Sequence, residues 1–252
     1  MTSRFVTNAD LVARLTGPLA QTLDYERMLE MTYRRLIRPG DTVLDIGAHS
    51  GRHAAVFAEL VGPGGAVHAF EPLPEALAML RARRLPAWVR VHETAIGEAE
   101  GQTEFVHARG TPEESGLRVK PYNRPNLVRP ERIRVRIAPL DSLAPALGRP
   151  AFLKIDVEGG EIGVLKSGRA LIAAARPWIT VEYGWPGYSA FGLERRSLFD
   201  EAAAQGYVIG DLFGARCGAL AEWEQVCDRA MWDWYLLPEE RAEAWSAALA
   251  AG

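Results

Sequence analysis

The amino-acid sequence predicts an α/β fold in which a mostly parallel sheet carries helices on both faces. Two observations predict this fold class. Apolar runs of four or five residues recur along the chain, and most are followed by a turn and by a stretch with helical spacing of apolar residues. Strands that alternate with helices form parallel sheets, because each helix carries the chain back across a face of the sheet.

The elements of the first half follow from turn residues and periodicity. Residues 1–40 are predicted to be a helical cap, which Pro39-Gly40 ends. Strands are expected at 42–46, 66–70 and 89–92, and helices at 52–61 and 74–84.

An inserted β-arm is expected over residues 103–138. Residues 103–107 and 132–137 alternate apolar and polar side chains, which predicts two half-exposed strands. The segment 108–131 between them is read as a long loop, and such loops are usually functional or mobile.

The second half returns to buried strands alternating with helices. Strands are expected at 151–155, 178–181, 207–211 and 230–237, and helices at 161–167, 194–205 and 238–251.

Composition narrows the function classes. With 48% hydrophobic and 24% charged residues, the 252-residue chain has the balance of a globular protein, and we expect a single domain over 1–252. A net charge of −3 gives no indication of a nucleic-acid partner. The sequence has two cysteines, no signal peptide and no run of ~20 apolar residues, which predicts a cytoplasmic protein without a membrane partner.

The most informative stretch is the glycine turn after the first predicted strand. Asp45 ends that strand, Gly47 and Gly51 would let the backbone approach a ligand, and Glu71 ends the second strand about twenty residues later. An acid at the latter position holds the hydroxyls of an adenosine ribose.

Two cofactors compete for this turn. A nicotinamide enzyme would have a second glycine where His49 stands, and Asp45 would repel a pyrophosphate. The same carboxylate suits the ammonium of a methionine moiety. S-adenosylmethionine (SAM) is therefore the favoured cofactor, and a dinucleotide-dependent oxidoreductase is the disfavoured alternative.

Five stretches together make the sequence resemble the FkbM-type class I SAM-dependent methyltransferases. They are residues 43–51 (VLDIGAHSG), 69–72 (AFEP), 93–97 (ETAIG), 140–143 (LDSL) and 152–161 (FLKIDVEGGE). One departure is His49, which stands where the family usually has Asn.

The resemblance implies a Rossmann-like sheet of seven strands with the last strand antiparallel. It also implies that SAM is lined by Asp45, Gly47, Gly51 and Glu71, with Thr94 and Ala95 bordering the adenine. The turn residues His49 and Ser50 and the fourth-strand residue Asp156 complete the predicted cofactor site.

The catalytic candidates are carboxylates at the ends of the fourth and fifth buried strands. Asp156 and Glu158 follow one strand and Glu182 ends the next, so all three are expected beside the transferred methyl group. Carboxylates that share a site raise one another's pKa, which suits a general base. A divalent cation held by the same oxygens is a less favoured alternative, and helix capping by Asp156 and Glu158 is the structural alternative.

The predicted function is transfer of a methyl group from SAM to a hydroxyl of a small molecule, a sugar or a natural-product intermediate. An N-methyltransferase and a non-catalytic SAM-binding module are the alternatives. The basic residues of the arm have two possible roles: they form a hairpin face exposed to solvent, or they bind an anionic acceptor. The charge of the acceptor therefore stays open. These basic residues are Arg109, Arg118, Lys120, Arg124, Arg129, Arg132, Arg134 and Arg136.

Overall fold

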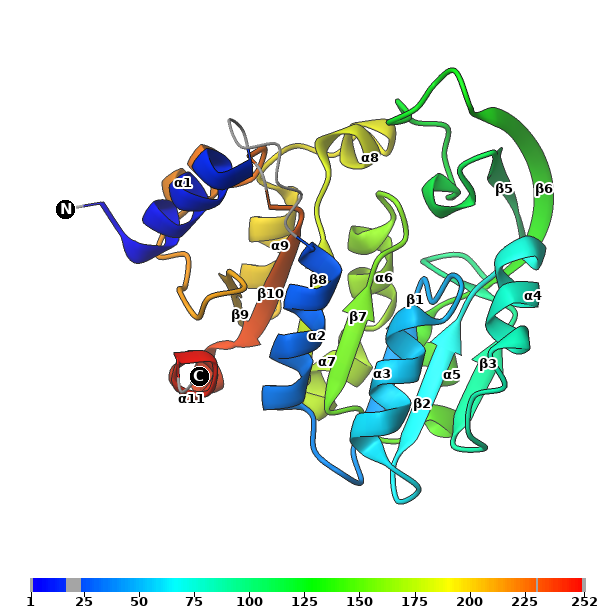
Figure 1. Cartoon of the computed structure of the whole chain (residues 1–252), viewed down its shortest axis with the longest axis horizontal. Coiled ribbons are helices and arrows are strands. Elements are labelled where there is room, and N and C mark those ends of the chain that lie inside the picture. The colour runs from blue at the N-terminus through cyan, green and yellow to red at the C-terminus, as the bar shows by residue number, and fades with distance from the viewer. Residues whose placement is uncertain (1, 17–23, 230, 251–252) are drawn as a thin grey trace.

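The computed structural model describes residues 2–16, 24–229 and 231–250 and has a seven-stranded sheet at its centre (Figure 1). The strand order is β3-β2-β1-β7-β8-β10-β9. Strand β10 is antiparallel to both of its neighbours, whereas the other adjacent strands pair in parallel. The seven strands are β1 (Thr42–Ile46), β2 (Ala66–Phe70), β3 (Val89–His92), β7 (Phe152–Ile155), β8 (Trp178–Glu182), β9 (Tyr207–Gly210) and β10 (Asp233–Pro238). The predicted sheet, with its antiparallel last strand, is confirmed.

Helices cover both faces of this sheet because successive residues of each buried strand point to opposite sides. On one face, Val43 and Phe152 pack with α2, α3 and α11. On the other face, Leu44 and Leu153 pack with α1, α5, α6, α7, α9 and α10. The helices are α1 (Arg4–Thr16), α2 (Tyr25–Leu36), α3 (Arg52–Val61), α4 (Pro74–Ala82), α5 (Leu140–Leu147), α6 (Glu161–Ser167), α7 (Arg169–Ala175), α8 (Trp185–Ala190), α9 (Ser197–Ala204), α10 (Leu220–Val226) and α11 (Ala242–Ala250).

Several helical boundaries differ from the prediction. The expected helical cap contains two separate helices, α1 and α2, and its residues 17–23 lie outside the described part of the chain. Residue 230 of the last predicted strand and residue 251 of the last predicted helix also lie outside it. Helices α5, α7, α8 and α10 were not predicted.

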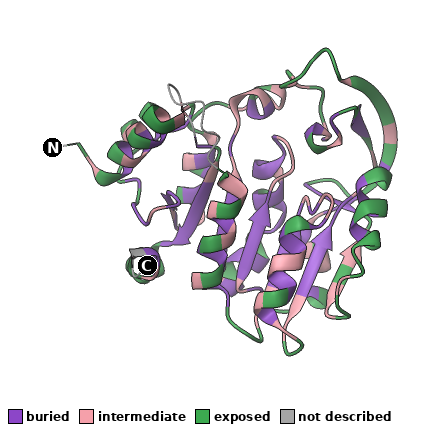
Figure 2. Cartoon of the chain, viewed as in Figure 1, coloured by how far each residue is buried: buried purple, intermediate pink, exposed green. Residues whose placement is uncertain are grey.

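The predicted arm belongs to a second sheet of three strands in the order β4-β6-β5. They are β4 (Ala95–Ile96), β5 (Gly101–Arg109) and β6 (Arg129–Ala138). Strands β5 and β6 form a hairpin that is longer than predicted, since their pairing runs from Gly101↔Ile137 to Arg109↔Arg129. Figure 2 shows β6 as largely exposed along its first half.

Ion pairs between exposed side chains link the two strands of the hairpin. Arg132 lies 2.5 Å from Glu104, and Arg109 pairs with Glu131. These contacts place part of the arm's positive charge on a solvated surface, where such pairs contribute little to stability. In the described segments, no helix combines the length and the apolar composition needed to cross a bilayer.

Candidate active site

A cavity of about 400 Å³ lies where the carboxyl ends of β1, β2, β7 and β8 meet. This volume is typical of a pocket for a cofactor or another small molecule. The hairpin arm lies on the same side of the molecule as the arrowheads of β2 and β7 (Figure 1), and the segment that follows β5 lines the cavity through η1 (Pro112–Glu114), Ser115 and Leu117. The cavity is therefore enclosed by both sheets.

The glycine turn after β1 lines this cavity through Gly47, Ala48, His49 and Ser50. Gly47 has a φ of +85°, and a Cβ there would lie 1.7 Å from the carbonyl oxygen of Asp156. The glycine is thus required for close approach of the β7 loop, and since it also lines the cavity, its predicted approach to a ligand stays a prediction.

Packing of the chain also requires a glycine at position 51, and Gly51 is not among the cavity-lining residues. Its φ is +79°, and a Cβ would lie 2.3 Å from Leu80 Cδ1 on α4. Packing against α4 therefore accounts for this glycine, and its contact with the cofactor stays a prediction.

Glu71 lies at the end of β2 with 6% of its surface exposed, and it lines the cavity as predicted. One carboxylate oxygen accepts the backbone N–H of His49 at 2.8 Å and the other accepts that of Leu73 at 2.8 Å. Burial raises the pKa of Glu71 to about 7. The two hydrogen bonds from backbone N–H groups act in the opposite direction, but burial outweighs them. Thr94 and Ala95 line the same part of the cavity.

Asp45 is fully buried and is not among the cavity-lining residues. It pairs across the sheet with Lys154, and neither carboxylate oxygen has a hydrogen-bond partner among the described residues. Burial raises the pKa of Asp45, while the nearby charge of Lys154 lowers it. The side chain of Asp45 therefore lies inside the sheet rather than at the cavity wall, and its direct contact with the ammonium group stays a prediction.

The three predicted catalytic carboxylates come together at the other side of the cavity. One oxygen each of Asp156, Glu158 and Glu182 lies within 4.8 Å of the others, and all three residues line the cavity. Glu158 has a φ of +61°, an uncommon conformation for a residue with a side chain. Backbone strain of this kind gathers at functional sites.

The carboxylates do not cap helix α6, which corrects the structural alternative. The N-cap residue is Gly160, without a side-chain cap. Instead, Glu161 of α6 accepts the backbone N–H groups of Val157 and Gly159 at 3.0 and 3.1 Å. Asp156 and Glu158 are thereby left for other contacts.

Burial and neighbouring charges give the three carboxylates different pKa values. Burial raises the pKa of Asp156, but Lys154, whose Nζ donates to Asp156 at 2.8 Å, outweighs it and leaves the pKa below its usual range. Burial raises the pKa of Glu158 to about 8. Burial also raises the pKa of Glu182 far above its ordinary value, and the charges of Asp156 and Glu158 raise it further.

A sequence profile described as "Methyltransferase FkbM domain" matches residues 45–209, which carry this cavity. The chain belongs to this family. Residues 45–209 therefore form an FkbM domain, a SAM-dependent methyltransferase domain, as the sequence predicted. A crystal structure of an FkbM methyltransferase from Methylobacillus flagellatus KT has the same fold, with a TM-score of 0.50 and 16% identity over 94% of this chain and 56% of that one.

Curated relatives match shorter stretches of this chain. The 31-O-demethyl-FK506 methyltransferase FkbM of Streptomyces tacrolimicus is 39% identical over 99 residues, 37% of this chain and 38% of that protein. A protein-L-isoaspartate O-methyltransferase of Ignicoccus hospitalis is 53% identical over 47 residues, 19% of this chain and 22% of the relative. The chain thus matches well under half the length of either relative.

The cavity of the FkbM domain fits SAM. The buried carboxylate of Glu71 faces a pocket of suitable volume, and each of its oxygens has one fixed N–H donor and a further lone pair. An acid at the end of the second strand is the feature that binds a ribose diol in such folds.

Two charged residues of the site were not predicted from the sequence. Lys120 comes from the arm, and its Nζ forms an ion pair with Glu158, with 7% of the lysine side chain exposed. Glu26 comes from α2 and also lines the cavity. The one available signal for Lys120 is composition, since the chain has only three lysines and two of them, Lys120 and Lys154, contact the carboxylates.

Proposed function

We propose that this protein transfers the methyl group of SAM to a hydroxyl oxygen of a small-molecule acceptor. The observation that carries the proposal is the position of Glu158 and Glu182 in the cavity with pKa values raised by burial. A neutral hydroxyl attacks more readily when a base removes its proton, and a base works best with a pKa near the operating pH.

The cofactor half of the site is assigned to the residues around Glu71. SAM, when bound, supplies an activated methyl group on its sulfonium. Glu71 accepts hydrogen bonds from the ribose hydroxyls, and Thr94 and Ala95 border the adenine. His49 and Ser50 line the cavity along the glycine turn. These contacts fix the position of the donor, and positioning supplies much of the rate of an in-line displacement.

The acceptor half is assigned to the carboxylate cluster. As the new C–O bond forms, the hydroxyl proton passes to a carboxylate oxygen of Glu158, with Glu182 as the second choice. Asp156 stays ionised because Lys154 donates a hydrogen bond to it and lowers its pKa. Lys120 keeps Glu158 oriented toward the arm.

The charge of the site bears on the acceptor class. Four carboxylates line this side of the cavity, Glu26, Asp156, Glu158 and Glu182, and they favour an uncharged, hydroxyl-bearing acceptor over an anionic one. The name of the Streptomyces tacrolimicus relative records methylation of an oxygen, which supports the choice of a hydroxyl. A sugar or a natural-product intermediate fits this description.

The test replaces each candidate base by its amide. Glu158→Gln is expected to lower kcat by about 10²–10⁴-fold, since it removes the basic oxygen and keeps the shape. Glu182→Gln is expected to lower kcat less. The affinity for S-adenosylhomocysteine, measured by calorimetry, should stay level in both variants. Glu161→Gln is the matched control, because Glu161 is in the same turn but is not among the cavity-lining residues.

Addition of EDTA separates the base from a metal-assisted mechanism. A base needs no cation, so activity should persist. Loss with EDTA and rescue by Mg²⁺ would instead assign the three carboxylates to a divalent cation. If both Gln variants keep more than about a tenth of the rate and EDTA has no effect, the cluster is structural and the base proposal fails.

A further inference from the structure

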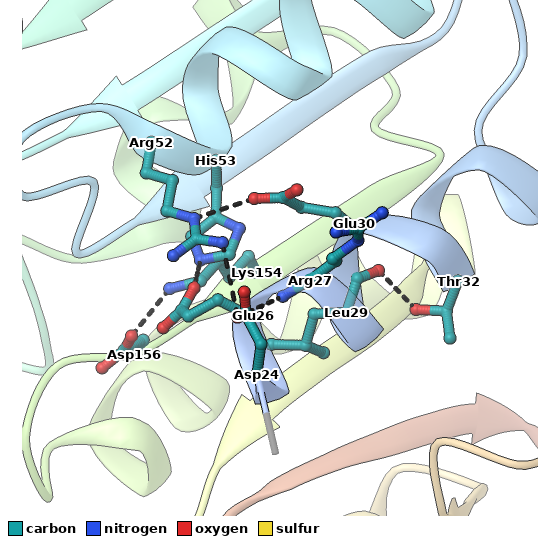
Figure 3. Close-up of polar contacts among 10 residues, drawn as sticks. All are labelled: Asp24, Glu26, Arg27, Leu29, Glu30, Thr32, Arg52, His53, Lys154 and Asp156. Atoms are coloured by element: carbon teal, nitrogen blue, oxygen red, sulfur yellow. Dashed lines mark hydrogen bonds and ion pairs between the residues drawn. The ribbon is translucent and has the colours of Figure 1, made fainter. Parts of the chain in front are cut away.

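Helix α2 brings one carboxylate into the cavity from outside the matched domain. The helix spans Tyr25–Leu36, whereas the family profile begins at residue 45. Its N-cap residue Asp24 accepts the backbone N–H of Arg27 at 3.0 Å, which fixes the first turn (Figure 3). Glu26 lies in that turn, and within the described ranges it is the one cavity-lining residue that precedes β1.

Glu26 is held in its ionised form by a histidine of α3. Glu26 Oε2 lies 2.5 Å from His53 Nε2, and Figure 3 shows both side chains beside Lys154 and Asp156. The hydrogen bond from His53 lowers the pKa of Glu26, against burial, which raises it. The other oxygen, Oε1, has no hydrogen-bond partner within the described residues, and 47% of the Glu26 side chain is accessible.

The neighbouring carboxylates are less suited to a cationic ligand group. Asp156 is already bound to Lys154 at 2.8 Å. Burial raises the pKa of Glu182 far above its usual range and so disfavours its charged form. Asp45 is not among the cavity-lining residues. Glu158 is paired with Lys120. Glu26 is therefore the carboxylate at this side of the cavity that combines a lowered pKa with an oxygen free of partners among the described residues.

The two sides of the cavity match the two ends of the cofactor. Glu71 lies with Leu73 and Thr94, and the proposed function places the ribose there. Glu26 lies instead with His53 and Lys154. We propose that Glu26 binds the α-ammonium group of SAM, so that helix α2 is part of the cofactor site. This inference rests on the proposed use of SAM.

Binding calorimetry with two ligands tests the assignment. S-adenosylhomocysteine has the amino-acid end, whereas 5′-methylthioadenosine lacks it. One charge-assisted hydrogen bond corresponds to about 10- to 150-fold in affinity. Glu26→Gln should therefore weaken S-adenosylhomocysteine binding by that factor and leave 5′-methylthioadenosine binding within about twofold. Unchanged binding of the second ligand also shows that the variant is folded.

Glu30→Gln is the matched control. Glu30 lies one turn further along α2, holds Arg52 of α3 at 2.8 Å and is not among the cavity-lining residues. It should leave both affinities unchanged. Equal weakening of both ligands by Glu26→Gln, or no weakening, would overturn the inference. Failure of the wild-type protein to bind S-adenosylhomocysteine would instead contradict the proposed function.

Discussion

Glu71 shows how a single residue combines burial with a fixed orientation. Its two oxygens are held by backbone N–H groups, so the carboxylate faces the cavity without losing its remaining acceptor sites. Charge-assisted hydrogen bonds to a diol contribute about 1.5–3 kcal/mol each. Glu71→Ala is expected to weaken S-adenosylhomocysteine binding by about 10- to 150-fold, as measured by calorimetry.

Glu75→Ala provides the comparison for that measurement. Glu75 is four residues further along the chain, contacts His107 at 2.9 Å and is not among the cavity-lining residues. Its removal should leave the affinity level. An unchanged affinity of the Glu71→Ala variant would remove Glu71 from the cofactor site.

The outcomes at single residues have a common physical cause. Glu71, Asp156, Glu158 and Glu182 were placed correctly in the cavity because they end or follow buried strands, and strand ends converge at one edge of a parallel sheet. Asp45 differs from them, because it lies within β1 rather than beyond its end. Spacing gives its position along β1 but does not say whether its side chain lies under the cavity or in it.

At the scale of elements, the arm controls the charge state of the proposed base. Lys120 lowers the pKa of Glu158, which burial raises to about 8. The base accepts a proton only when ionised, so kcat should rise with pH through this value. Lys120→Met removes the positive charge, and the rising limb should move to higher pH, as a pH–rate profile will measure. Lys120→Arg keeps the positive charge, so kcat should again rise over the same pH range as in the wild type.

Arg118→Gln controls for a general effect of the arm. Arg118 also belongs to the arm, but it lies over the ring of Phe191, 5.8 Å from its centroid, and does not pair with Glu158. Its pH profile should match that of the wild type. A Lys120→Met variant with an unshifted limb would show that the ion pair has no part in setting the pKa of the base.

Helices and strands could be predicted from the sequence where local residues mark their ends. Strands β1 and β2 and helices α3 and α6 have the predicted bounds, because glycine or proline marks their ends. Strand β3 also has the predicted bounds. Short helices such as α8 and α10 escaped prediction because tertiary packing stabilises them. Tyr188 of α8 and Trp223 of α10 are fully buried, and both rings pack on Tyr183.

For the whole molecule, buried acids link stability to pH. Burial raises the pKa to about 7 for Glu71, Glu161 and Asp233, and to about 8 for Glu158. Between about pH 6.5 and 8.5 the folded protein therefore binds protons that the unfolded chain has released. Stability falls as pH rises across this window. Burial lowers the pKa of His49, His68 and His92, so these three histidines titrate below this window and do not oppose the trend.

The expected outcome is a lower Tm at about pH 8.5 than at about pH 6.5 for the protein without cofactor, measured by calorimetry. Glu161→Gln should reduce this fall, because the amide oxygen still accepts the N–H groups of Val157 and Gly159 and does not titrate. A Tm that rises over the same interval would contradict the proposed protonation of the buried acids.

The separation of the two sheets has a consequence for how such proteins diversify. Strand β6 pairs with β5 on one side and with β4 on the other, and within the described residues neither hairpin strand pairs with the seven-stranded sheet. Exchange or lengthening of the hairpin therefore leaves the ladder of the central sheet intact. Substitutions in the hairpin can therefore accumulate without breaking the strand pairing that holds Glu71 and Asp156 at the cavity.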